Sequence, residues 1–147
     1  MSRSWQPPPN SALAWNLGAW VRVLRGEPDR AFDYAARAKR LSPLDPSMYA
    51  TNGAVAYAHF LVGDYDMASS FAEKSLHHNP EFLLATGVFA ASNALAGRLA
   101  AAQKGIARLR ECNPDLRLSN LGDLVPFRRP EDIAHFAKGL REAGLPE

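Results

Sequence analysis

The side chains that could carry chemistry in this 147-residue chain are four histidines, one cysteine and a pair of aspartates. His77 and His78 are adjacent, so on a helix their side chains point about 100° apart, unlike the i, i+4 spacing of a helical zinc pair. At the end of a helix, their positive charge would instead offset the helix dipole. We expect His59, in the middle of a helix, to be packed or to line a groove.

The aspartates and the cysteine also lack the partners that catalysis requires. Asp64 and Asp66 flank Tyr65 in a turn, where alternation places the two carboxylates poorly for shared acid–base work. Asp64 is better suited to cap the helix that follows it. Cys112 has no histidine or aspartate partner nearby in the sequence, and we expect it to be an ordinary buried cysteine. The sequence therefore predicts a protein that is not an enzyme and that uses no cofactor or metal.

The composition favours a helical protein of about one domain. Hydrophobic residues make up 47% of the chain, alanine is abundant and β-branched residues are few, which favours helix over strand. The net charge of +2 shows no concentrated basic face, so we expect no nucleic-acid partner. A single cysteine excludes an intrachain disulfide. No signal peptide opens the chain and no apolar run reaches the ~20 residues of a membrane span. We expect a soluble, cytoplasmic protein without a membrane partner.

Three segments of the chain repeat one pattern of glycine, alanine and proline. They are "GEPDRAFDYAARAKRLSP", "GDYDMASSFAEKSLHHNP" and "GRLAAAQKGIARLRECNP", which begin at Gly26, Gly63 and Gly97. In each segment an alanine follows the glycine by five residues and a proline follows it by seventeen. The period is 37 and then 34 residues, and a 34-residue unit with two helices is typical of the tetratricopeptide repeat (TPR). The sequence resembles the TPR family at these positions.

The pattern predicts an all-α fold, a TPR α-solenoid of three helix-turn-helix repeats with a C-terminal capping helix, about seven helices in all. The repeats are expected at 12–48, 49–82 and 83–116, followed by a loop and the capping helix in 117–147. The expected helices span 11–25, 28–41, 46–62, 65–78, 81–96, 98–112 and 130–144. Residues 1–10 contain three prolines and are expected to be extended. Small residues should let paired helices approach closely, at Ala19, Ala56, Ala90, Ala31, Ala68 and Ala102.

A narrower resemblance lies in three short stretches of the chain. "RLSPLDP" (40–46), "GDYDMA" (63–68) and "PFRRPEDIAHFAKGLREAGLPE" (126–147) are similar to the TPR region that closes many bacterial class III adenylate cyclases and winged-helix transcriptional regulators. This resemblance implies the regulatory or scaffold part of a larger bacterial protein. In those proteins a cyclase or DNA-binding domain precedes the repeats. Here the repeats start near residue 11 and leave no room for such a domain in this chain, so the resemblance assigns no catalytic or DNA-reading residue.

The resemblance to the TPR family also implies a concave groove lined by the first helix of each repeat. The candidate protein-binding residues in that groove are Asn16, Trp20, Tyr57, Phe60, Leu61 and Leu84. The aromatic residues among them either form a binding strip or pack internally. Family members that bind chaperones clamp a carboxylate with Lys and Arg of the third such helix, and residues 81–96 contain neither, which excludes that activity. We therefore expect a non-catalytic interaction module for a peptide or a neighbouring domain. Homo-oligomerisation through exposed solenoid ends, as in a homodimer, is the alternative.

Overall fold

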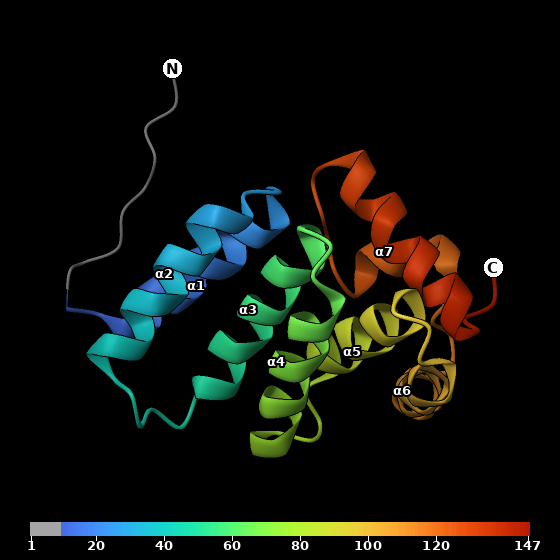
Figure 1. Ribbon diagram of the computed structural model, residues 1–147, viewed down its shortest axis with the longest axis horizontal. Helices are drawn as coiled ribbons and strands as arrows, with labels where there is room; N and C mark the ends of the chain where they lie inside the picture. Colours follow the sequence, from blue (N-terminus) through green and yellow to red (C-terminus); the bar gives the residue numbers. More distant parts are fainter. Residues whose placement is uncertain (1–9) are drawn as a thin grey trace.

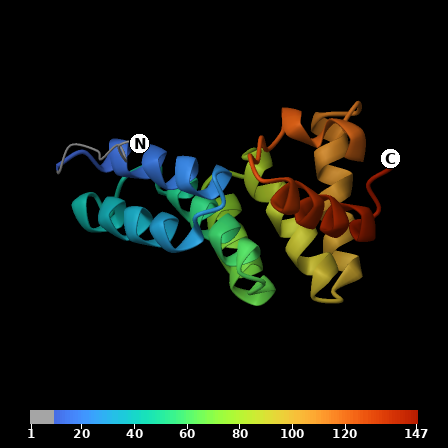
Figure 2. The ribbon, with the colours of Figure 1, turned by 90° about the horizontal axis from the view of Figure 1, so that it is seen from above.

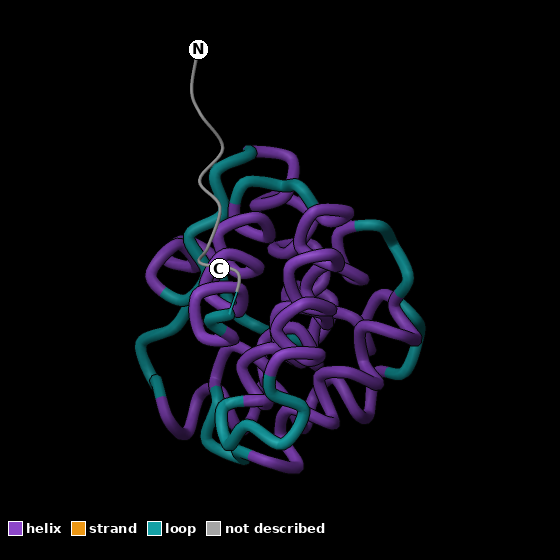
Figure 3. The backbone as a smooth tube through the Cα atoms, turned by 90° about the vertical axis from the view of Figure 1, so that its left-hand side faces the viewer, coloured by secondary structure: helices purple, strands orange, loops and turns teal. Residues whose placement is uncertain are grey.

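The computed structural model describes residues 10–147, and within them every regular element is a helix (Figures 1 and 3). The elements are α1 (Ala12–Leu24), α2 (Pro28–Leu41), α3 (Met48–Leu61), α4 (Tyr65–His78), α5 (Leu83–Leu95), α6 (Leu99–Cys112), the 3₁₀-helix η1 (Leu118–Asp123) and α7 (Pro130–Ala143). The all-α fold that the sequence predicts is confirmed. The extended conformation expected for residues 1–10 lies outside the described residues, apart from Asn10. Between residues 10 and 147, no helix combines the length and the apolar composition that a membrane crossing requires.

The helices form three hairpins that stack in sequence order, α1–α2, α3–α4 and α5–α6 (Figures 1 and 2). Helix α3 packs against both helices of the first hairpin, and α5 packs against both helices of the second. The close approach depends on the repeated alanines. Each is at most 1% exposed: Ala19, Ala31, Ala56, Ala68, Ala90 and Ala102. Longer side chains at these positions would hold the helices apart.

The repeated glycines and their neighbours set the ends of the helices. Gly26, Gly63 and Gly97 have φ angles of 77°, 82° and 85°, the left-handed conformation that glycine adopts without steric cost. Asp64 caps α4 by accepting a hydrogen bond of 3.2 Å from the backbone N–H of Met67. The helix-capping role that the sequence predicts for Asp64 is confirmed.

Two helices begin two residues later than their sequence pattern predicts, α3 at Met48 rather than residue 46 and α5 at Leu83 rather than residue 81. Before α3, the Asp45 carboxylate accepts a hydrogen bond of 2.7 Å from the backbone N–H of Ser47. Before α5, the side chain of Asn79 accepts one of 3.2 Å from the backbone N–H of Glu81. These side-chain-to-backbone turns compete with helix formation, and therefore delay both helices.

The last helix, α7, packs mainly against α5 and less against α6. It lies beside the third hairpin in the two ribbon views (Figures 1 and 2). Gly139 makes this contact possible. A Cβ atom added there would lie 2.8 Å from the Ala91 Cβ and 3.0 Å from both the Cα and the carbonyl oxygen of Ala91. Ala91 lies on α5 one repeat period of 34 residues after the candidate groove residue Tyr57, and therefore at the equivalent position of the third repeat. The capping helix therefore lies on the concave side of the third repeat.

Candidate protein-binding surface

Two of the predicted groove residues, Tyr57 and Phe60, are completely buried. The Phe136 ring of α7 lies 5.8 Å from the ring of Tyr57 and 5.9 Å from that of Phe60, measured between centroids. The ring of Phe127, in the segment that leads into α7, lies 6.0 Å from that of Tyr57. These side chains therefore contact the C-terminal segment of the chain itself rather than solvent, and α7 fills this part of the concave face.

The other predicted groove residues differ in exposure. Asn16 is buried, and its Oδ1 atom has no hydrogen-bond partner among the described residues. Leu61 and Leu84 are half-buried against the core. The Leu84 carbonyl accepts a hydrogen bond of 2.7 Å from the Tyr57 hydroxyl, so this hydroxyl has a hydrogen-bond partner although it is buried. Burial also raises the pKa of Tyr57 well above its ordinary value, which keeps the hydroxyl protonated as a donor.

A half-buried aromatic cluster remains open to solvent beside Tyr57. We define the groove patch as Trp20, Tyr49 and Phe82. The Phe82 ring lies 6.1 Å from the Trp20 ring and 5.0 Å from the Tyr49 ring, edge to face in both cases. The Trp20 indole N–H donates a hydrogen bond of 3.0 Å to the Ala50 carbonyl, which fixes the ring. The groove patch therefore presents a rigid aromatic surface, and the indole N–H of Trp20 already has its hydrogen-bond partner within the chain.

Tyr49 and Phe82 are members of the groove patch that the sequence pattern did not identify. Phe82 is the N-cap residue of α5, and Tyr49 lies in the first turn of α3, both outside the groove positions that the repeat assigns. One signal for the cluster is Gly53 in the middle of α3. A Cβ atom added there would lie 2.8 Å from Phe82 and 3.1 Å from Trp20, so the two rings occupy the space that this glycine leaves.

Two of the four histidines, His59 and His135, serve the packing of helices, whereas His77 and His78 are exposed in the last turn of α4. The His59 ring lies 4.6 Å from that of Phe32 and stacks at 5.5 Å on Phe71, so it is packed between helices. His135 stacks on Phe60 at 4.3 Å and shares a hydrogen bond of 2.9 Å with the Tyr65 hydroxyl. Burial lowers the pKa of both histidines, so both favour the neutral form.

The remaining candidates for chemistry lie apart from one another. The Asp64 carboxylate caps α4, whereas that of Asp66 forms an ion pair of 2.7 Å with Arg98 in the turn between α5 and α6. Cys112 is exposed, so the expectation that it is buried was wrong. It is the last residue of α6 and lies on the exposed side of the helix with Arg108 and Glu111, whereas Leu109 on the other side is buried. Within residues 10–147, no cluster of three histidine, cysteine or acidic side chains could hold a metal ion.

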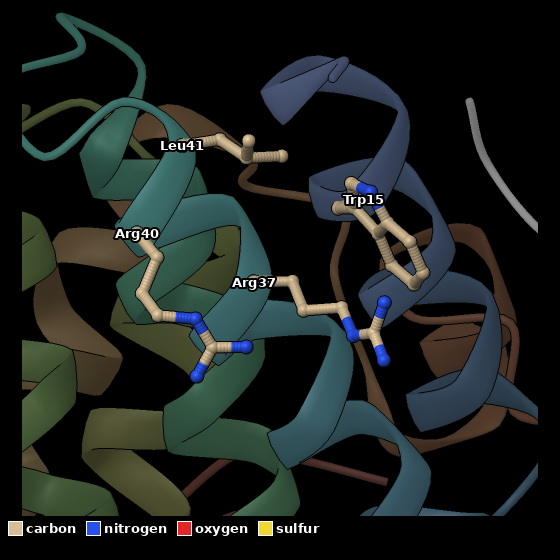
Figure 4. Close-up of a pocket in the computed structure, with 4 residues that line it drawn as sticks. All are labelled: Trp15, Arg37, Arg40 and Leu41. Carbon is tan, nitrogen blue, oxygen red and sulfur yellow. The ribbon is translucent and has the colours of Figure 1, made fainter. Parts of the chain in front are cut away.

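A separate pocket of about 210 Å³ lies between α1 and α2, lined by Trp15, Arg37, Arg40 and Leu41 (Figure 4). The Arg37 guanidinium lies 4.7 Å from the centroid of the Trp15 ring, a cation–π contact. The Trp15 ring also packs edge to face against Tyr34 at 4.9 Å, and the residue is 4% exposed. This tryptophan, in the first turn of α1, therefore joins the two helices of the first repeat.

Comparison with known proteins identifies the fold. No protein-family model matches the sequence, and no curated protein matches it. Among solved structures, the crystal structure of PilW, described as a widely conserved type IV pilus biogenesis factor, superposes with a TM-score of 0.67 over 92% of this chain. This chain has a TPR-type solenoid fold. It is 23% identical to PilW and covers 60% of the PilW chain, so the similarity concerns the fold.

Proposed function

We propose that this chain is a non-catalytic protein-interaction module that binds a peptide or a neighbouring domain through its concave face. The observation that carries the proposal is the groove patch. Helix α7 covers Tyr57 and Phe60, yet it leaves Trp20, Tyr49 and Phe82 partly exposed beside them. Aromatic side chains of this kind dominate the energy of protein interfaces, because they bury a large area at little entropic cost.

The contacts beneath the patch favour binding without rearrangement. Tyr57 lies under Trp20, with 5.6 Å between ring centroids, and is itself fixed by its hydrogen bond to Leu84. The side chains that would meet a partner are therefore ordered before it arrives, which reduces the entropy lost on binding. An apolar or aromatic side chain of the partner would lie across Trp20, with Leu84 and Leu61 as the further groove contacts.

The narrower resemblance of residues 40–46 and 126–147 supports a proposal about context. In this proposal the module is the regulatory or scaffold part of a larger bacterial cyclase or transcriptional regulator and acts in the cytoplasm. Sequencing the native gene product on both sides of residues 1–147 tests it. A cyclase or winged-helix domain there would support this context, whereas unrelated flanking sequence would contradict it.

Self-association through an end of the solenoid, as in a homodimer, is the second candidate function. The observation that favours it is the exposure of Leu13, Leu17 and Val21 on α1. Exposed apolar side chains that lie together on one helix face are a feature of protein-interaction sites.

A peptide-display library selected against the purified chain tests binding at the groove patch. We expect enriched peptides whose Kd rises about tenfold or more in Trp20→Ala and Phe82→Ala, because hot-spot truncations cost at least ~1.4 kcal/mol. Met67→Ala, which alters a partly exposed apolar residue on α4, is the matched control and should leave the Kd within about twofold. Circular dichroism checks that each variant is folded. If nothing is enriched, or if the peptides bind both patch variants as tightly as wild type, the proposal is wrong.

A further inference from the structure

The segment that leads into α7 also reaches the first repeat. The backbone N–H of Arg128 donates a hydrogen bond of 2.9 Å to the carbonyl of Leu24, the last residue of α1. The Arg129 guanidinium donates one of 3.3 Å to the carbonyl of Gly26, in the turn between α1 and α2. We call residues 125–132 the strap. It passes beside this turn in both ribbon views (Figures 1 and 2).

The strap lies close against this turn because position 26 has no side chain. A Cβ atom added to Gly26 would overlap the Arg129 Cδ atom and would lie 2.6 Å from the Asp132 Oδ2 atom. The other two helix-ending glycines, Gly63 and Gly97, have nearly the same φ angle, yet a Cβ atom at either of them would meet no described atom within 4 Å. The close contact is therefore a feature of the first repeat and not of the repeat pattern in general.

These contacts join parts of the array that a solenoid normally keeps apart. In a repeat array each unit contacts only its neighbours, so a terminal repeat is held from one side. Here both helices of the first repeat pack against α3, and the strap also connects the turn of this repeat to α7, which packs against α5 and α6. The first repeat is therefore held from two sides, by the second repeat and by the C-terminal segment.

The strap also contacts the residues that support the groove patch. Phe127 of the strap is buried, and its ring lies 6.0 Å from that of Tyr57, the ring that lies under Trp20. Leu24, which accepts the hydrogen bond from the strap, lies one turn after Trp20 on α1. The strap thus contacts both the helix that carries Trp20 and the ring beneath it.

We propose that the strap joins the first repeat to the capping helix and thereby fixes Trp20 relative to Phe82 in the groove patch. Trp20 belongs to the first repeat and Phe82 to the start of the third, so their spacing depends on how these two repeats are held. Stacking through the second repeat provides one connection, and the strap provides the other. An array that is connected in this way resists the local opening of its first hairpin. The effect on binding rests on the proposed function of the groove patch, whereas the connection itself does not.

Amide hydrogen exchange measured by NMR tests the connection. Gly26→Ala displaces the Arg129 side chain and the Asp132 carboxylate from the turn. Gly63→Ala and Gly97→Ala are the matched controls, because they introduce the same left-handed alanine without displacing a neighbour. We expect the amides of Arg128 and of α1 to exchange at least about tenfold faster in Gly26→Ala than in either control. Equal exchange of these amides in the three variants overturns the proposal.

A second pair of variants repeats the test without a strained alanine. Arg129→Met keeps most of the apolar side chain but removes the donor to the Gly26 carbonyl, and it should speed exchange of the Arg128 amide about threefold or more. Glu131→Gln is the control, because it removes the ion pair of 3.1 Å between Glu131 and Arg129 and leaves the bond to Gly26, so exchange should match wild type. Wild-type exchange in Arg129→Met also overturns the proposal.

Peptide affinity tests whether the strap positions Trp20. Peptides selected on the groove patch should bind Gly26→Ala with a Kd about fivefold or more above that of Gly63→Ala or Gly97→Ala. A general loss of stability does not produce this difference, because all three variants carry the same backbone strain. Equal Kd values would show that the strap does not position Trp20 and would overturn that part of the proposal. If no peptide is selected, the proposed function fails, and the exchange measurements still decide whether the strap holds the first repeat.

Discussion

The contact between α7 and α5 at Gly139 gives the sharpest test of how the concave face is built. In Gly139→Leu, the new Cβ atom would lie 2.8 Å from the Ala91 Cβ and 3.0 Å from the Ala91 backbone. Overpacking that nearby side chains can relieve costs about 1–3 kcal/mol. Here the obstacle includes backbone atoms, so α7 must move away from α5. Phe136 and Leu140 are at most 1% exposed, and losing the burial of both is worth about 3–6 kcal/mol.

Urea unfolding monitored by circular dichroism measures this loss. We expect the free energy of unfolding of Gly139→Leu to fall by about 3–6 kcal/mol. Lys138→Leu is the matched control, since it adds the same side chain one residue earlier on the exposed face of α7, and should change stability by less than about 0.5 kcal/mol. A loss below about 1 kcal/mol in Gly139→Leu would show that α7 is not seated on α5 at this residue.

Two further perturbations test the packing of the repeats and the role of a buried histidine. Ala56→Leu should lower the free energy of unfolding by about 1–3 kcal/mol, because Ala56 is completely buried between helices. The exposed Ala36→Leu should remain near wild type in the same urea titration, and wild-type stability in Ala56→Leu would contradict the repeat register. Burial lowers the pKa of His135 in the folded state. The neutral His135 therefore contributes to the stability of the fold above the unfolded pKa of histidine, about 6.5, and this contribution is lost as the pH falls through the folded pKa. Urea midpoints between about pH 7.5 and pH 5 should therefore fall less in His135→Gln than in wild type. The half-buried His59, whose pKa is also lowered by burial, accounts for part of the remaining loss. An equal or steeper fall in His135→Gln would refute this role.

The repeat architecture could be predicted from the sequence because its determinants are local and recur. Gly63 ends one helix and Asp64 caps the next through contacts within a few residues. A buried alanine such as Ala68 recurs at the same distance from each glycine, so three weak signals reinforce one another. The two largest errors in helix bounds, at the starts of α3 and α5, arose where side chains such as Asp45 bind the backbone just before a helix and delay its start.

The groove could not be predicted to the same depth, because its shape depends on contacts between distant residues. The spacing of Phe136 and Leu140 in the last helix predicts an apolar face, but it does not say which surface of the array that face covers. The structure places it over Tyr57, nearly eighty residues earlier in the chain. Likewise, Phe82 joins Trp20 only through the stacking of successive hairpins, so the sequence did not assign it to the binding surface.

The concave face divides according to the size of the side chains that line it. On α5, Gly87 and Ala91 follow Gly53 and Tyr57 by one repeat period; both are small, and α7 packs there. A Cβ atom at Gly87 would already lie 3.3 Å from the Phe136 ring. On α1, Trp20 occupies the equivalent surface, which leaves no room for a second helix. Tyr57 lies at the boundary and contacts both Trp20 and Phe136.

This boundary couples the seating of α7 to the order of the groove patch. If α7 moves away from α5, Tyr57 loses its contact with Phe136, and the support beneath Trp20 loosens. Gly139→Leu should therefore weaken the binding of selected peptides as well as destabilise the fold, although Gly139 lies outside the patch. Lys138→Leu should bind them with the wild-type Kd. Wild-type affinity in a Gly139→Leu protein whose α7 has been destabilised would show that the patch is ordered by the first two repeats alone.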